Sequence, residues 1–235
     1  MSRLVLFGDY IVAAPGEAPI KDGAVVLENE NVVELGPSAL LLKRHPDAKL
    51  LGGPGTVVIP GLIDAHQHGR GITNIQRGVA DGFLEQWLTR LRGLWPVDPY
   101  LATAAAAIRL LRSGVTTTMH HLSSTGVVPL RDEVNASLQA YRDIGLRVTF
   151  ALDFRNQHSY VYAPDDEFLA SLPNELARSI REKLPPRIPS GPSEVPRLLP
   201  EMRRNWASSK LRLALGPQGS TWSVDADRKL TRLER

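Results

Sequence analysis

Residues 59–68 read Ile-Pro-Gly-Leu-Ile-Asp-Ala-His-Gln-His, a short apolar run that ends in two histidines one residue apart. Successive side chains of a β-strand point to opposite faces, so residues two apart point the same way. We therefore expect a strand over 57–66, with His66 and His68 converging and Asp64 close by. Two convergent imidazoles make half of a transition-metal site. The plainer alternative is a pair of polar residues at the mouth of a loop.

From residue 56 onward, apolar strands alternate with helical segments. The β-branched run 115–119 predicts a strand, and apolar residues at helical spacing followed by glycine predict a helix over 130–144. The full expected order is strand 57–66, helices 81–92 and 99–112, strand 115–119, helix 130–144, strand 146–152, a proline-rich insertion over 159–200, helix 193–207, strand 211–215 and a last helix from residue 223. Four strand-then-helix units in a row favour a parallel sheet with right-handed crossovers.

Polar, reactive residues follow each of these strands. They are His66 and His68, then His120 and His121, then Asp153, Arg155, Gln157 and His158, and finally Gln218. Parallel α/β folds build their active sites at this edge of the sheet. No Gly-x-Gly-x-x-Gly or phosphate loop follows the first strand, which favours a barrel over a doubly wound sheet. We therefore predict an α/β protein of the (β/α)8 TIM-barrel type.

Only the first four β/α units of such a barrel are expected. A complete barrel needs about 250 residues, whereas residues 56–235 number 180. Residues 1–55 form a separate predicted region of short strands, with Gly-Gly-Pro-Gly at 52–55 as a breaker. Its expected strands are 4–7 and 10–13, followed by a hairpin of 24–27 and 32–35. The predicted division is thus 1–55 and 56–235.

The composition is that of an ordinary globular protein, with 43% hydrophobic and 23% charged residues among 235. The chain has no cysteine, so disulfides and thiolate metal sites are excluded, and a cytoplasmic location is expected. No signal-peptide core or membrane-spanning apolar run is present, so we expect no membrane partner. The net charge of +3 comes largely from the C-terminal third, where solvated helix faces are expected rather than a nucleic-acid surface. His45, before Pro46, is expected at the surface.

Three segments together resemble the amidohydrolase superfamily. Residues 58–68 (Val-Ile-Pro-Gly-Leu-Ile-Asp-Ala-His-Gln-His) are similar to its first-strand signature, and 113–121 (Ser-Gly-Val-Thr-Thr-Thr-Met-His-His) to its second strand. Glu85-Gln86-Trp87-Leu88, together with Pro99-Tyr100 and the alanine-rich helix that follows, resembles the branch of triazine hydrolases and cytosine/guanine deaminases. The resemblance implies that 1–55 is the N-terminal part of a composite β-sandwich. It also implies a metal-dependent hydrolase that acts on non-peptide carbon–nitrogen bonds.

The resemblance further implies a set of site residues. His66 and His68 would bind one divalent metal ion, zinc or iron, and Asp64 would orient the site or the strand end. After the fourth strand, Leu-Gly-Pro-Gln-Gly contains no lysine or glutamate that could bridge two metals, which favours the one-metal subtype that includes the deaminases. Gln218 would contact the substrate; otherwise it is a polar residue in a glycine turn. His121 would also line the substrate cavity; a buried structural histidine is the equal alternative.

The expected reaction is deamination of a small heterocyclic substrate by a metal-bound hydroxide. The family's later metal ligands and acid–base residues have no counterpart in this sequence, so the catalytic residues stay unassigned. The main alternative is a truncated, catalytically incompetent or partner-dependent half barrel, which would pair with a C-terminal half or with copies of itself as a homo-oligomer. A third hypothesis is a small-molecule binding module without chemistry.

Overall fold

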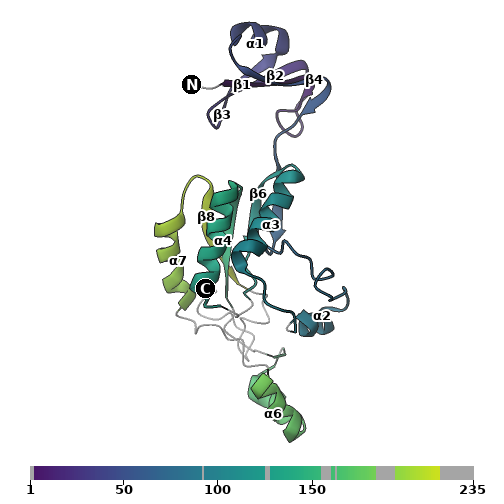
Figure 1. Cartoon of the computed structure of the whole chain (residues 1–235), viewed down its shortest axis with the longest axis vertical. Coiled ribbons are helices and arrows are strands. Elements are labelled where there is room, and N and C mark those ends of the chain that lie inside the picture. Colours follow the sequence, from purple (N-terminus) through teal and green to yellow (C-terminus); the bar gives the residue numbers. More distant parts are fainter. Residues whose placement is uncertain are drawn as a thin grey trace. The chain divides into compact units, whose positions relative to one another are not determined.

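The computed structural model describes residues 3–91, 93–124, 128–154, 160–161, 163–183 and 194–217. The chain divides into two compact units, Met1–Gly61 and Leu62–Arg235. Each unit contains one four-stranded sheet within these residues (Figure 1). No helix in the described ranges is long and apolar enough to cross a membrane.

The first unit is a mixed sheet with one short helix against it. Its elements are β1 (Arg3–Ile11), β2 (Ile20–Glu28), β3 (Asn31–Pro37), α1 (Ser38–Arg44) and β4 (Lys49–Val58). The strand order is β3-β2-β1-β4; β1 and β2 pair antiparallel, as do β2 and β3, while β4 runs parallel to β1. Val5, Ala24 and Val26 are buried in this unit together with Leu41 of α1. The predicted hairpin is confirmed by the pairing of β2 with β3.

The predicted strand over 57–66 is wrong, because two strands of different sheets share those residues. β4 continues to Val58, which pairs with Ile11 of β1, and β5 begins at Leu62. Pro60 and Gly61 separate the two strands, since proline cannot donate a ladder hydrogen bond and glycine weakens a strand. The structural division at Gly61 therefore lies six residues after the predicted one at residue 55.

Residues 52–55, which were predicted to be a breaker, lie inside β4. Gly52 has φ +124°, and a Cβ there would lie 1.9 Å from the carbonyl oxygen of Phe7 on β1. Only glycine permits this close approach of two backbones. Between β3 and Gly52 the chain forms α1 and the start of β4.

The second unit is an α/β arrangement on a parallel sheet, as predicted. Its strands are β5 (Leu62–Gln67), β6 (Val115–His121), β7 (Arg147–Phe154) and β8 (Leu211–Pro217), in the order β5-β6-β7-β8 with every neighbouring pair parallel. Its helices are α2 (Leu84–Leu91), α3 (Pro99–Arg112), α4 (Leu130–Ile144), α5 (Asp165–Ala170), α6 (Asn174–Lys183) and α7 (Glu194–Trp206). Helices α3, α4 and α7 run beside the sheet, with α4 packed against both others (Figure 1).

Local signals explain why α3 and α4 have the predicted bounds. The Asp98 side chain accepts a hydrogen bond from the Leu101 backbone at 2.9 Å, and Pro99 occupies the first turn of α3. Gly145, with φ +81°, ends α4 in the left-handed conformation.

Within the proline-rich insertion, the described part contains α5 and α6. The helix predicted from residue 223 lies outside the described residues.

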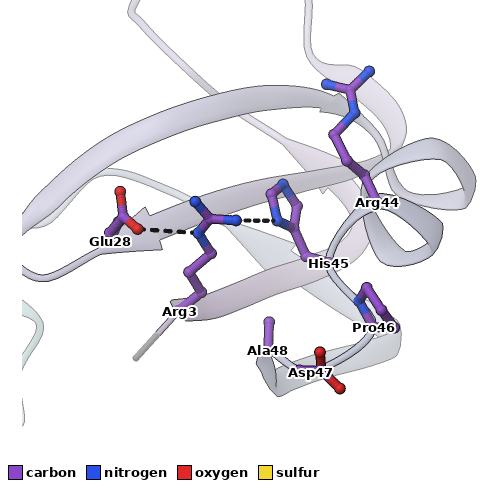
Figure 2. A pocket seen from close by; sticks show the side chains of 7 residues that line it. All are labelled: Arg3, Glu28, Arg44, His45, Pro46, Asp47 and Ala48. Carbon is purple, nitrogen blue, oxygen red and sulfur yellow. Dashed lines mark hydrogen bonds and ion pairs between the residues drawn. The ribbon is translucent and has the colours of Figure 1, made fainter. Parts of the chain in front are cut away.

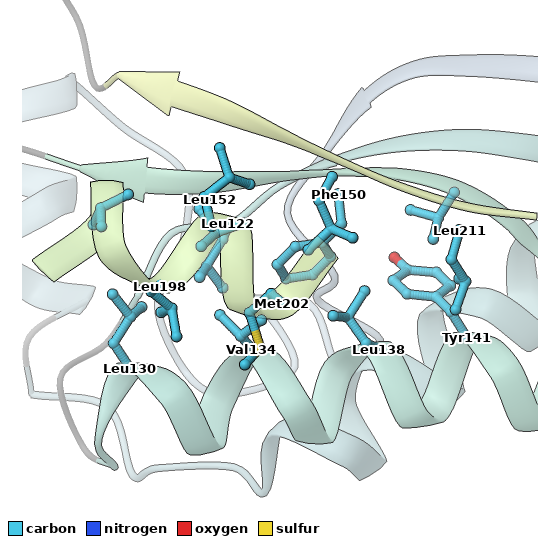
Figure 3. Close-up of a cluster of buried hydrophobic side chains, with 14 of the residues drawn as sticks. Leu122, Leu130, Val134, Leu138, Tyr141, Phe150, Leu152, Leu198, Met202 and Leu211 are labelled. Carbon is cyan, nitrogen blue, oxygen red and sulfur yellow. The ribbon is translucent and has the colours of Figure 1, made fainter. Parts of the chain in front are cut away.

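One hydrophobic core joins α4 and α7 to the sheet. Phe150 and Leu152 of β7, two residues apart, point into it together with Leu138 of α4 and Met202 of α7 (Figure 3). Because strand side chains alternate, the intervening residues of β7 point to the other face of the sheet. The core therefore determines which side chains at the strand ends remain available for a site.

Candidate functional site

Three histidine rings converge where β5 and β6 end. The ring centroids of His66 and His68 are 4.8 Å apart, and each lies 5.8 Å from the ring of His121. His66 is exposed, whereas His68 and His121 are half-buried. The structure thus brings the two histidines of the first strand together and adds His121 from the neighbouring strand. We call these three residues the histidine cluster.

A backbone contact determines the tautomer of His68. Its Nδ1 lies 2.8 Å from the carbonyl oxygen of His121. A carbonyl only accepts, so Nδ1 carries the proton and Nε2 keeps a free lone pair. Burial lowers the pKa of His68, positive charge on Arg70, His66 and His121 lowers it further, and the His121 carbonyl opposes this. A neutral imidazole with one nitrogen tied to a carbonyl is the form in which histidine binds metals.

His121 carries a polar atom without a partner. Its Nδ1 is buried and has no hydrogen-bond partner among the described residues. Burial and the nearby His66 lower its pKa, while the Gly216 carbonyl raises it. A Cβ on Gly216 would lie 2.7 Å from His121 Nε2, so the glycine of β8 makes room for the ring. An unpaired buried polar group costs about 1–3 kcal/mol, which a ligand at this position would offset.

His120 points away from the histidine cluster. It is 2% exposed, its ring centroid lies 4.6 Å from that of Phe150, and its Nδ1 lies 3.0 Å from the Tyr141 hydroxyl. Burial lowers its pKa to about 3, so it is neutral at physiological pH. Adjacent strand residues point to opposite faces, and the apolar core contains His120 while its neighbour His121 joins the cluster.

Asp64 acts on the backbone rather than on a histidine ring. The pairing of β5 with β6 shifts register between Asp64 and Gln67, which marks a bulge around His66. The Asp64 carboxylate accepts from the His66 backbone N–H at 3.3 Å and from the Thr118 hydroxyl at 3.2 Å. These contacts hold the end of β5, and an orienting role for Asp64 stays a prediction.

The histidine cluster does not form a metal site by itself. Across the described ranges, no group of three or more histidine, cysteine, aspartate or glutamate residues could hold a metal ion. The donor set nevertheless fits a divalent transition metal, because imidazole suits zinc and iron and His68 Nε2 is free. A metal ion bound by His66 and His68 would therefore need further ligands. The predicted substrate residue Gln218 lies outside the described residues, as do Arg155, Gln157 and His158.

Arg70, two residues after His68, was not among the predicted site residues. Its guanidinium carbon lies 6.0 Å from the ring centroid of Trp87 on α2, and its Nη2 lies 3.5 Å from the Ser123 hydroxyl. Burial, and then the charge of Arg77, lowers the pKa of Arg70. The signal in the sequence is an arginine flanked by two glycines directly after the second histidine.

A polar hollow in the first unit is a separate feature. It is lined by Arg3, Glu28, Arg44, His45, Pro46, Asp47 and Ala48 (Figure 2). His45 is 6% exposed, so its expected surface position is wrong. Its Nδ1 lies 3.2 Å from Arg3 Nη1 and its Nε2 lies 2.8 Å from a Glu34 oxygen. These contacts tie the end of α1 to β1 and β3, which explains the burial.

Comparison with known proteins identifies the class to which this fold belongs. The profile of the Amidohydrolase family matches residues 57–190, more than half of the chain. The chain therefore belongs to the amidohydrolase family.

Individual relatives agree with this assignment. The chain is 26% identical to a 5-methylthioadenosine/S-adenosylhomocysteine deaminase of Symbiobacterium thermophilum, over 90% of this chain and 54% of that protein. Among solved structures, a triazine hydrolase from Arthrobacter aurescens has a TM-score of 0.68 at 19% identity, covering 94% of this chain and 48% of that one. An adenosine deaminase from Xanthomonas campestris with bound zinc has a TM-score of 0.55 at 19% identity, covering 92% and 43%. The chain thus spans about half the length of these relatives.

Proposed function

We propose that this chain is part of a metal-dependent hydrolase that removes an amino group from a heterocyclic ring. The observation that carries the proposal is the convergence of His66 and His68, with Nδ1 of His68 committed to a backbone carbonyl. This leaves a preorganised pair of imidazole nitrogens at the carboxyl edge of a parallel sheet, the edge where such folds carry out chemistry.

His66 and His68 would hold one divalent ion, zinc or iron. When bound, such an ion supplies the Lewis acidity that makes water nucleophilic near neutral pH. The lowered pKa of His68 favours the neutral ring that a metal requires. The zinc named with the Xanthomonas campestris deaminase supports the choice of metal.

The substrate would be a small heterocycle with an exocyclic amine. The names of the Symbiobacterium thermophilum and Xanthomonas campestris deaminases support this substrate class. His121 would contact the ring, because its buried Nδ1 is without a hydrogen-bond partner in the described part of the chain. Gln218 is proposed as a second contact on its sequence position alone. The cytoplasmic location stays a prediction.

We also propose that the parallel sheet is the first half of a (β/α)8 barrel and the first unit part of a β-sandwich. Edge strand β5 exposes 50% of Leu62 and 74% of Ile63, and edge strand β8 exposes 42% of Leu215. Exposed apolar residues on unpaired strands call for further strands. Four more parallel strands would cover both edges and would supply the remaining metal ligands and the acid–base carboxylate. A chain without them is the partner-dependent alternative.

The test combines metal binding with ammonia release. The double variant His66→Ala, His68→Ala should abolish binding of Zn²⁺ measured by equilibrium dialysis, whereas His45→Gln in the first unit should not affect it. Ammonia release from adenosine, cytosine, guanine and aminotriazines would then be measured with Zn²⁺ present. Unchanged Zn²⁺ binding by the double variant contradicts the proposal. Zn²⁺ binding without ammonia release favours the partner-dependent half barrel.

A further inference from the structure

Gln67, the residue between His66 and His68, makes hydrogen bonds through both ends of its side-chain amide. The Gly69 backbone N–H donates to Gln67 Oε1, and Gln67 Nε2 donates to the Tyr141 hydroxyl at 2.7 Å. Because a backbone N–H can only donate, the amide orientation of Gln67 follows from Gly69. The side chain therefore connects the turn around His68 to helix α4.

The hydroxyl that receives Gln67 lies deep in the core. Tyr141 is fully buried, and burial raises its pKa, so it keeps its proton (Figure 3). Its oxygen accepts from Gln67, and its other hydrogen-bond partner is His120 Nδ1 at 3.0 Å. Gln67, Tyr141 and His120 thus form a hydrogen-bonded chain across β5, α4 and β6, in which Tyr141 and His120 are buried; we call this chain the relay.

Gly69 packs against the relay at the ring of His120. It has φ +66°, and a Cβ there would lie 2.2 Å from His120 Cε1. The turn after His68 therefore packs directly on the His120 ring. The hydrogen bonds of the Gln67 side-chain amide hold the backbone at residue 67, and the His120 ring holds it at Gly69. His68 therefore lies between two fixed backbone positions.

We propose that Gln67, Tyr141 and His120 are positioning residues that hold His66 and His68 in a metal-binding arrangement. The relay touches neither imidazole of the pair and acts through the backbone between them. This inference rests on the proposed function, because it assigns these residues to the same metal site. Substituting a residue that supports a metal ligand typically lowers metal affinity by about 10- to 100-fold.

The test measures binding of Co²⁺, whose visible absorption reports its ligand geometry. Tyr141→Phe removes one oxygen and keeps the aromatic packing, so we expect about tenfold weaker Co²⁺ binding or more, with an altered spectrum. Tyr100→Phe is the matched control, since that hydroxyl bonds Asp143 instead. Gln67→Met, which keeps the side-chain length without the amide, should reproduce the effect and serves if Tyr141→Phe does not fold.

A control for stability separates positioning from general weakening of the core. Leu138 is fully buried on α4, three residues before Tyr141, and has no polar atom in the relay. Leu138→Ala should lower the unfolding temperature and leave Co²⁺ affinity unchanged wherever the variant is folded. Equal losses of affinity in Leu138→Ala and Tyr141→Phe would overturn the positioning role.

The double variant distinguishes this inference from the proposed function. If His66→Ala, His68→Ala loses Co²⁺ and Tyr141→Phe binds it as tightly as the wild type, only the relay is refuted. If the double variant binds Co²⁺ as the wild type does, the metal site itself is wrong and the inference fails with it.

Discussion

Acid should destabilise the second unit through His120. This buried histidine has a pKa of about 3, whereas an unfolded chain has the ordinary value of about 6.5. Below pH 6.5 the His120 imidazole therefore binds a proton in the unfolded state and stays neutral in the folded state. The stabilisation is fully present above pH 6.5 and is lost as the pH falls toward 3.

The magnitude follows from the difference in pKa. A difference of one in pKa between the folded and unfolded states corresponds to about 1.4 kcal/mol. Protonation of His120 should therefore reduce the free energy of unfolding by about 2 kcal/mol between pH 6.5 and pH 5. The loss would reach about 5 kcal/mol near pH 3, as an order of magnitude. This loss is comparable to a large part of the stability of a small domain.

Urea unfolding followed by tryptophan fluorescence is the assay. All four tryptophans follow residue 61, so the signal reports the second unit alone. The wild type should lose about 2 kcal/mol more than His120→Gln between pH 6.5 and pH 5, and His66→Gln provides a control at an exposed histidine. Parallel pH profiles for the wild type and His120→Gln would refute the reasoning, as would an NMR titration of His120 near pH 6.5.

Two further substitutions test local contacts. Gly216→Ala should displace the His121 ring, because the new Cβ would lie 2.7 Å from its Nε2; the ring resonances of His121 should shift on the NMR spectrum. Gly82→Ala is its control, because a Cβ at that position would have no atom of a residue beyond its chain neighbours within 4 Å. Equal spectra for both variants would contradict the packing. Asp98→Ala removes the N-cap of α3 and should lower the free energy of unfolding by about 1 kcal/mol, measured in urea; an unchanged midpoint would show that the cap contributes nothing.

Local chemistry explains the elements that were predicted well. The helix over 130–144 is bounded by Pro129 and Gly145, and its apolar residues recur at the period of a helix. Such signals act within a few residues, so they can be read without knowing the fold. The convergence of His66 and His68 is of the same kind, because it requires only neighbouring residues at the end of one strand.

Elements that depend on distant partners were missed. The run 57–66 reads as one strand, yet its first part pairs with Ile11 and its second part with β6. His45 was expected at the surface and is buried because Arg3 and Glu34 bond both ring nitrogens. The residues that cause these outcomes lie far away in the sequence, where periodicity carries no information about them.

The alternation of strands and helices, the parallel α/β class and the pair of histidines at a strand end could all be predicted from the sequence. These follow from side-chain periodicity and local capping. Which of His120 and His121 joins the cluster depends on tertiary packing, because the apolar core of α4 and β7 occupies one face of β6. Tertiary packing also decides that Gln67 reaches Tyr141, since a side chain finds a partner 74 positions away only when the chain has packed.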